Sequence, residues 1–310
     1  MITGATSGIG LEIARGLAGR GARTVVVGRG AERAARVAEQ IARSTANPAV
    51  ESVGVTDLAL LEEVRTLSAT LVARYPRLHI LVNNAGAYFQ RRDVTSEGHE
   101  RTYALNVLAP FLLTSLLSDR LRESAPARVV NVSSAAHRGY HVDFDDLESA
   151  HRYAGFRAYG RSKLELLLLT REFARRFAGT GVCVNAVHPG FVASRFGQNN
   201  GRWTAGVMRI LEALFAISPR RGAETPLFVA TDPSAMPISG EYFVRSRVAR
   251  ASADSYDLES ARRLYEVCRG TTGAPDLGAP ARSGSAAVRP PPRGSLEVTT
   301  SRRPVGTRAS

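Results

Sequence analysis

Short aliphatic runs alternate with helix-forming stretches along most of this 310-residue chain, and no other feature constrains the fold as strongly. Four of the runs end in small or polar residues: RTVVVG (23–28), HILVNNAG (79–86), RVVNVSS (128–134) and VCVNAVHPG (182–190). Continuous apolar strands are typical of a parallel sheet that is covered on both faces. Because helical stretches lie between them, the pattern predicts an α/β fold with a single doubly wound parallel sheet and helices on both faces.

The expected elements fill residues 1–269, which we interpret as one domain. Two further strands are expected at 49–58 and 241–246, and helices are expected at 9–20, 31–44, 58–75, 98–121, 157–178 and 257–268. From residue 270 the composition changes. Residues 270–310 are rich in Gly, Pro, Ala, Ser and Arg and poor in large apolar side chains, which predicts a disordered tail.

The chain is basic, with 41 Lys and Arg against 28 Asp and Glu and a formal net charge of +13. Such a balance is compatible with binding to nucleic acid or to an anionic membrane. The arginines are nevertheless scattered among acidic residues, as in RRDVTSEGHER (91–101). This mixing favours a solvated surface and no nucleic-acid partner.

Other compositional features exclude several classes of site. No apolar run reaches the ~18 residues of a membrane span, so no transmembrane segment is expected. Cys183 and Cys268 are the only cysteines and form no disulfide framework, which favours a cytoplasmic location. The six histidines show no ligand spacing such as HExxH, so no metal site is expected.

The sequence TGATSGIG (3–10) stands directly before the first expected helix. Its glycines at 4, 8 and 10 permit a tight turn and let a pyrophosphate approach the main chain, while the helix N-terminus offers free N–H groups. A tight strand-to-helix connection without a ligand is the alternative interpretation. Only Met1 and Ile2 precede the turn, whereas a strand needs about 5 residues. We expect either a start further upstream or a shortened first strand, and we expect residues added before Met1 to raise stability.

Lys163 is the only lysine, so every other basic residue of the Lys and Arg total is an arginine. It follows Tyr159 by four residues in YGRSK (159–163), and positions i and i+4 share one face of a helix. An ammonium is a compact donor, while a guanidinium is a wide planar fork. The single lysine therefore favours a site in which Lys163 acts on Tyr159.

Together these motifs resemble those of the short-chain dehydrogenase/reductase family. The turn has the spacing T-G-x-x-x-G-x-G, and NNAG (83–86), ALNV (104–107), NVSS (131–134), Y-x-x-x-K (159–163) and HPGFVAS (188–194) follow in the order of the family. The segments ESAPARVVNVSS (123–134) and SGEYF (239–243) are most similar to its retinol-dehydrogenase-like branch. The resemblance covers residues 1–268 and implies a Rossmann-fold oxidoreductase domain over residues 1–269.

The resemblance implies four catalytic residues. Tyr159 is the expected general acid/base, and Lys163 is expected to lower the pKa of the phenol and to bind the nicotinamide ribose. Ser134 is expected to donate to the substrate oxygen, with Ser133 as the alternative. Asn106 is expected to hold a water in a proton relay to Lys163. Taken singly, each residue could instead be structural: a helical tyrosine, a helix cap or a buried amide that satisfies the main chain.

The resemblance also implies a nicotinamide cofactor. NAD-preferring members have an acid at the end of the second strand, where this chain has Gly28 and Arg29. Arg29 could pair with a 2′-phosphate, so NADP(H) is expected rather than NAD(H), with a solvated loop arginine as the alternative. Asp57 resembles the adenine-contacting acid of the family and could also cap the next helix. The expected cofactor contacts are Gly4, Thr6, Ser7, Gly8, Ile9, Gly10, Arg29, Asp57, Asn84, Ala85, Gly86, Tyr159, Lys163, Pro189, Gly190, Val192 and Ser194.

Residues 191–220 lie where the family has a mobile lid. Their apolar stripe could pack on the core, line a lipophilic pocket or face a membrane; it consists of Trp203, Val207, Met208, Ile210, Leu211, Leu214 and Phe215. We therefore predict an NADP(H)-dependent ketoreductase or alcohol dehydrogenase acting on a lipophilic alcohol, ketone or aldehyde, in a family where homo-oligomers are common. The alternatives are an epimerase or cyclase on the same scaffold and a non-catalytic cofactor-binding regulator.

Overall fold

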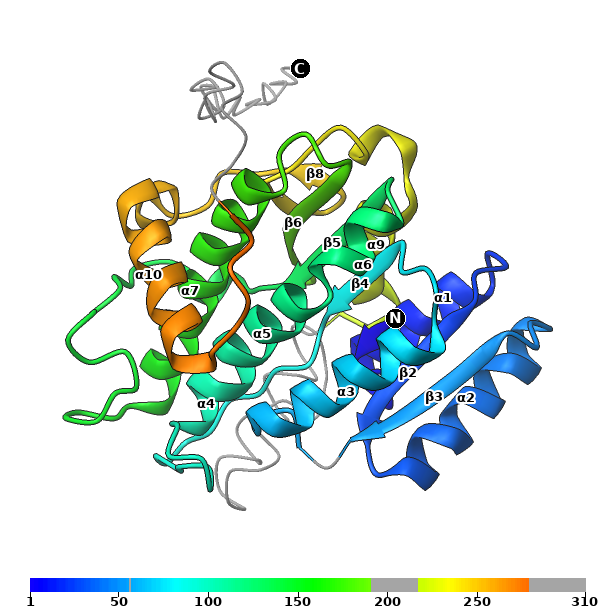
Figure 1. Ribbon diagram of the computed structural model, residues 1–310, viewed down its shortest axis with the longest axis horizontal. Helices are drawn as coiled ribbons and strands as arrows, with labels where there is room; N and C mark the ends of the chain where they lie inside the picture. Colours follow the sequence, from blue (N-terminus) through cyan, green and yellow to red (C-terminus); the bar gives the residue numbers. More distant parts are fainter. Residues whose placement is uncertain (56, 191–216, 279–310) are drawn as a thin grey trace, which may run out of the picture.

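A computed structural model describes residues 1–55, 57–190 and 217–278. In these residues eight strands form one sheet in the order β3-β2-β1-β4-β5-β6-β7-β8 (Figure 1). The strands are β1 (Ile2–Thr3), β2 (Thr24–Arg29), β3 (Val50–Val55), β4 (Ile80–Asn83), β5 (Ala127–Val132), β6 (Val182–His188), β7 (Tyr242–Val244) and β8 (Arg247–Val248). Neighbours are parallel except β7 and β8. The strand order changes direction at β1, which confirms the expected doubly wound sheet.

Helices cover both faces of this sheet (Figure 1). One face carries α1 (Gly8–Ala18), α2 (Ala31–Thr45) and α9 (Pro219–Thr231). The other face carries α3 (Leu61–Arg74), α5 (Ala109–Leu116), α7 (Gly155–Arg176) and α10 (Leu258–Thr272). The short helices α4 (Arg101–Tyr103) and α6 (Ser118–Glu123) flank α5. Among the described residues, none of the helices combines the length and the hydropathy that a membrane span requires.

Alternate residues of the central strands enter two separate apolar cores. Val25 and Val27 of β2 belong to the core beneath α3, α5, α7 and α10, whereas Val26 belongs to the core beneath α1 and α9. Leu81 and Val82 of β4 divide in the same way. Each such burial stabilises the fold by about 1.5–3 kcal/mol. Because both faces are covered, these strands need apolar residues at successive positions, which is why aliphatic runs locate them.

Strand β1 has only two residues, yet it lies in the middle of the sheet. Ile2 pairs with Val26 on one side and with Val82 on the other. The α-amino group of Met1 donates to the main-chain oxygen of Ile80 at 2.8 Å, and the oxygen of Met1 accepts from the N–H of Val82 at 3.0 Å. Burial lowers the pKa of this amine to about 5. The amine is therefore neutral at pH 7 and takes part in the ladder as an ordinary donor.

The single helix expected over residues 98–121 is divided. Residues Ala104–Leu108, between α4 and α5, form a π-helical turn. Such turns are rare and frequently occur at functional sites. This one carries Asn106, one of the residues expected to be catalytic.

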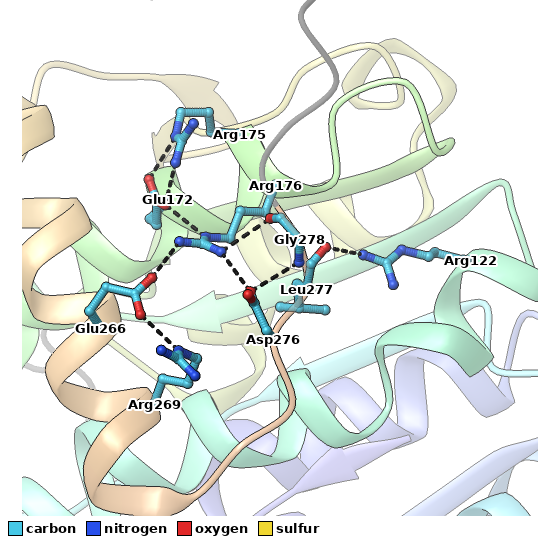
Figure 2. Close-up of polar contacts among 9 residues, drawn as sticks. All are labelled: Arg122, Glu172, Arg175, Arg176, Glu266, Arg269, Asp276, Leu277 and Gly278. Atoms are coloured by element: carbon cyan, nitrogen blue, oxygen red, sulfur yellow. Dashed lines mark hydrogen bonds and ion pairs between the residues drawn. The ribbon is translucent and has the colours of Figure 1, made fainter.

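Arg176 of α7 links this helix to α10 and to the residues that follow α10 (Figure 2). Its guanidinium carbon lies 3.6 Å from the centroid of the Tyr265 ring, and its side chain is only 8% exposed. It forms ion pairs with three acids, Glu172 (2.8 Å), Glu266 (2.8 Å) and Asp276 (3.2 Å). Ala274 and Leu277 beyond the helix are buried. The boundary expected at residue 270 thus falls inside α10, residues 270–278 pack on the domain, and residues 279–310 lie outside the described residues.

Candidate active site

The glycine-rich turn joins β1 to α1 at the carboxyl edge of the sheet. Gly4 and Gly8 have φ angles of 65° and 58°, a region that favours glycine. A Cβ on Gly10 would lie 2.5 Å from the main-chain oxygen of Gly4, so the turn closes only without a side chain there. Ser7 makes no side-chain capping bond, and the first turn of the 11-residue helix α1 has no acidic residue. This arrangement fits the pyrophosphate of a dinucleotide, because the helix N-terminus attracts anions.

Asn84 and Thr3 hold the end of β4 beside the glycine turn. The hydroxyl of Thr3 accepts from the N–H groups of Asn84 and Ala85, both at 3.0 Å. The side-chain amide of Asn84 donates to the main-chain oxygen of Thr3 at 2.9 Å. Gly86 comes next, and a Cβ there would lie 3.2 Å from Nζ of Lys163. The expected contacts 84–86 therefore lie between the glycine turn and the expected catalytic lysine.

Two arginines stand beside the end of β2. Arg29 is exposed, and Arg33 of α2 donates to the main-chain oxygen of Thr6 at 3.4 Å. Thr6 in turn lies against β2, since a Cβ on Gly28 would be 2.2 Å from its methyl carbon. A pocket opens at this point, lined by Gly30, Ala31, Gly54, Val55 and Glu63. Arg33 was not expected from the sequence, although its place in the first turn of the helix that follows β2 is a usable signal.

Asp57 is already engaged by protein groups. Its carboxylate pairs with Arg101 and accepts the N–H of Ala59 at 3.0 Å. Asp57 therefore caps the turn that precedes α3 and does not cap α3 itself. The N-terminus of α3 is capped by Glu97, whose carboxylate accepts from the N–H groups of residues 61 and 62 at 2.6 and 3.1 Å. A contact between Asp57 and adenine stays a prediction.

The two serines after β5 point in different directions. Ser133 is 3% exposed, and its hydroxyl donates to the main-chain oxygen of Lys163. The hydroxyl oxygen of Ser134 accepts the N–H of Ala136 at 3.1 Å, and the same side chain hydrogen-bonds Tyr159. This bond acts to lower the pKa of Tyr159, which is the effect of a hydroxyl group that donates to the phenol oxygen. Ser134, and not the alternative Ser133, stands next to Tyr159.

Tyr159 and Lys163 lie one turn apart on α7, as expected, with Nζ of the lysine 5.5 Å from the centroid of the phenol ring. The lysine ammonium donates to the main-chain oxygen of Val132 at 3.1 Å. Burial lowers the pKa of Lys163 to about 8. Burial also raises the pKa of Tyr159 to about 12, although the hydrogen bond from Ser134 acts in the opposite direction and lowers this pKa. Desolvation of the phenolate thus outweighs the effect of Ser134. The expected lowering of the tyrosine pKa by Lys163 stays a prediction.

The amide of Asn106 is satisfied by the chain itself. Its oxygen accepts the N–H of Ala87 at 3.0 Å, and its nitrogen donates to the oxygen of Ala87 at 2.9 Å and to the hydroxyl of Ser162 at 3.0 Å. The π-helical turn thereby links the loop that follows β4 to α7. These contacts agree with the interpretation of Asn106 as a buried amide that satisfies the main chain. The water relay stays a prediction.

Part of the expected site follows β6. Pro189 and Gly190 come directly after this strand, and Gly190 has a φ of 92°. A Cβ on Gly190 would lie 2.6 Å from the Ile217 side chain. Val192, Ser194 and the apolar stripe at 203–215 lie outside the described residues.

The geometry agrees with comparisons to known proteins. A family model described as short chain dehydrogenase matches residues 1–205. The chain belongs to the short-chain dehydrogenase family. Retinol dehydrogenase 12 of Mus musculus is 41% identical over 267 residues, which cover 86% of this chain and 84% of the relative. Retinol dehydrogenase 11 of Homo sapiens is 38% identical over 277 residues, covering 89% and 86%. This short-chain dehydrogenase is thus in the retinol-dehydrogenase-like branch and is an alcohol/carbonyl oxidoreductase that uses a nicotinamide cofactor.

Solved structures share the fold. A protein of Mycobacterium paratuberculosis described as putative and uncharacterized superposes with a TM-score of 0.70 at 29% identity, covering 88% of this short-chain dehydrogenase and 92% of that chain. The Pseudomonas aeruginosa RhlG/NADP active-site complex gives a TM-score of 0.61 at 28% identity, with 82% and 93% covered.

Two aromatic residues beside Tyr159 in this short-chain dehydrogenase were not expected from the sequence. The ring centroids of Tyr88, Phe156 and Tyr159 are 6.5 Å apart in each pair. Phe156 is 58% exposed, which is high for a large apolar side chain. A Cβ on Gly155 would lie 2.3 Å from the main-chain oxygen of Phe89, so this glycine lets the loop after β4 approach α7. The signal in the sequence was the position of Phe156, three residues before Tyr159 on one helix face.

Proposed function

We propose that this short-chain dehydrogenase interconverts an alcohol and a carbonyl on a lipophilic small molecule with NADP(H), and that Tyr159 is its general acid/base. The observation that carries the proposal is the hydrogen bond between Ser134 and Tyr159, with Lys163 one turn further along the same helix. The cofactor supplies or accepts the hydride when it is bound. The side chains of the protein orient the substrate oxygen and move its proton.

Each of these side chains has a defined task in the proposed reaction. In the direction of reduction, the protonated phenol of Tyr159 gives its proton to the carbonyl oxygen, and the high pKa of Tyr159 keeps that proton in place beforehand. The hydroxyl of Ser134 donates to the same oxygen and stabilises the negative charge that develops there. Lys163, with its pKa of about 8, is a cation at neutral pH and favours the phenolate that results.

The lipophilic class of substrate rests on the aromatic side chains around Tyr159. The rings of Tyr88 and of the exposed Phe156 both have their centroids 6.5 Å from that of Tyr159. Ligand sites are lined mainly by such side chains with a few polar groups. Two relatives are named retinol dehydrogenase, and retinol is a lipophilic alcohol, which agrees with this class.

The choice of NADP(H) rests on Arg29 and Arg33. Arg29 is the last residue of β2, whereas Arg33 lies in the first turn of α2 and reaches the glycine turn. No acidic residue stands between Gly28 and Ala31 to bind a ribose 2′-hydroxyl. A 2′-phosphate would be favoured here by charge-assisted hydrogen bonds.

The test uses the full chain with NADPH or NADH and a panel containing all-trans-retinal, a medium-chain aldehyde and an aromatic ketone. We expect NADPH oxidation with the retinal or aldehyde, a lower Kd for NADPH than for NADH, and loss of turnover in Tyr159→Phe with cofactor binding retained. No turnover on any carbonyl, or an equal rate in Tyr159→Phe, would refute the proposed reaction. Equal Kd values or tighter NADH would refute the cofactor assignment alone.

A further inference from the structure

The peptide unit that follows Ser134 is held between two imidazole rings. Its carbonyl oxygen, that of Ser134, lies 2.5 Å from Nδ1 of His137. Its N–H group, that of Ala135, donates to Nδ1 of His188 at 3.3 Å. One ring comes from the short helical turn after β5 and the other from the last residue of β6. A single peptide group therefore has a histidine on each side.

The partners of each ring determine where its proton lies. The main-chain N–H of Ser252 donates to Nε2 of His137 at 3.1 Å, and an N–H group can only donate. Nε2 is therefore unprotonated, and Nδ1–H of His137 donates to the oxygen of Ser134. By the same reasoning Nδ1 of His188 is unprotonated because it accepts from Ala135. Both rings must be neutral for the arrangement to exist.

Other groups around the rings also keep them neutral. Burial lowers the pKa of both histidines, and that of His188 falls to about 4. Arg138, on the turn that follows Ser134, disfavours a positive charge on either ring. Arg171 of α7 acts on His137, and His137 acts on His188. From β7, the uncharged ring of Tyr242 packs edge-on against His137, 5.2 Å between centroids.

We propose that His137 and His188 are positioning residues that clamp the peptide plane after Ser134 and thereby aim its hydroxyl group at the substrate oxygen. The orientation of this plane is set by the ψ angle of Ser134, which is 156°. The next N–H, that of Ala136, donates to the hydroxyl oxygen of Ser134 at 3.1 Å. A rotation of the clamped plane would move this N–H and turn the hydroxyl away from Tyr159. The inference rests on the proposed function, because it requires Ser134 to act in the reaction.

The decisive comparison is His188→Asn against His188→Gln. The oxygen of an asparagine side chain can take the place of Nδ1 and accept from Ala135, whereas that of glutamine lies one methylene further out. We expect His188→Asn to keep kcat within about threefold of the parent and His188→Gln to lose about tenfold, the size of one hydrogen bond. The Kd for NADPH should be unchanged in both, which also shows that both variants fold.

A double variant distinguishes positioning from general damage. In a Ser134→Ala background, His188→Gln should cause no further loss of kcat, because the hydroxyl that the clamp aims has been removed. If the parent chain is active, an additive loss of kcat in the double variant would overturn the inference. An equal loss of kcat in the asparagine and glutamine variants would do the same. A parent chain without carbonyl reduction would instead refute the proposed function. If His188→Gln does not fold, His137→Asn replaces it. This variant keeps the donor to the oxygen of Ser134 but loses the link to Ser252. If it also lowers kcat in the Ser134→Ala background, the clamp is again overturned.

Discussion

The hydroxyl group of Ser133 donates to the main-chain oxygen of Lys163 at 3.0 Å. This bond ties the end of β5 to the helix that carries Tyr159 and Lys163. Ser133 is therefore used for structure, and the adjacent Ser134 is left to face the phenol. Neighbouring serines in one motif have separate roles that the sequence does not distinguish.

Substitution of each serine by alanine should separate these roles. We expect Ser134→Ala to lower kcat by about 10²–10³-fold, because a donor to the developing oxyanion is lost. Ser133→Ala should leave kcat within a few fold and lower the free energy of unfolding by about 1 kcal/mol. Steady-state kinetics and urea unfolding measure the two effects. A larger kinetic loss in Ser133→Ala would reverse the assignment.

Lys163→Arg tests whether the single lysine supplies more than charge. Nζ lies close to Gly86 and donates to Val132, so the wider guanidinium does not fit the same space. We expect kcat to fall by about 100-fold with a native circular dichroism spectrum. Since the pKa of Lys163 is about 8, the parent should lose activity as pH rises past 8, whereas arginine stays charged and the variant should not. Full activity in Lys163→Arg would show that charge alone is sufficient.

Arg33→Ala should weaken NADPH binding more than NADH binding. Loss of a charge-assisted hydrogen bond to a phosphate raises the Kd by about tenfold or more, and the same is expected of Arg29→Ala. Arg36→Ala is the matched control, because Arg36 is an exposed arginine of the same helix that pairs with Glu32. Titration of cofactor fluorescence gives all the Kd values. Parallel weakening of NADPH by all three variants would indicate a general effect of charge.

Glu165→Gln should stabilise the protein increasingly as pH rises from 5 to 8. Burial raises the pKa of Glu165 to about 8, and no hydrogen-bond partner of its Oε1 is found among the described residues. The folded chain keeps a proton that the unfolded chain releases above its ordinary pKa, so this group lowers stability by about 1 kcal/mol per pH unit in that window. Glutamine has no such dependence. Urea unfolding at three pH values measures the difference between variant and parent.

The comparison with the parent is needed because Met1 acts in the opposite direction. Its amine has a pKa of about 5 in the folded chain, so the unfolded chain takes up a proton between pH 5 and 8 and stability rises with pH. This contribution is the same in both proteins and cancels in the difference. The exposed Glu39→Gln is the control, because it removes a carboxylate that is not buried. A constant difference for Glu165→Gln would mean that Glu165 is ionised in the fold.

Arg176→Met should lower the free energy of unfolding by about 3 kcal/mol. It leaves a nearly buried Glu172 with Arg175 alone and removes the links to α10 and to Asp276. Arg269→Ala, which breaks a solvent-exposed pair with Glu266, should cost at most about 1 kcal/mol. Urea unfolding compares the two. Equal losses would show that Arg176 is no more than a surface ion pair.

The strands and the catalytic motif could be predicted because local patterns determine them. Central strands buried on both faces require aliphatic runs, and Tyr159 and Lys163 share a helix face by spacing alone. The helix α9 was not expected, because Pro226 inside it resembles a helix stop. The π-helical turn at Asn106 depends on bonds to Ala87, which is distant in sequence.

Long-range contacts account for the remaining differences. Asp57 resembles a helix cap in the sequence, but its main partner, Arg101, lies 44 residues away. The pKa of Tyr159 is raised by burial, which depends on the packing of several elements that local spacing does not reveal. The histidine pair around Ser134 is brought together by β5 and β6, and the HPG motif gave no indication of it.

The chain contains a single lysine, and the side chain of Lys163 is buried. A reagent that acylates lysine can therefore label this side chain only when the catalytic helix becomes accessible. Mass spectrometry of the peptide that carries Lys163 consequently reports, over time and from a native sample, how often the active site opens.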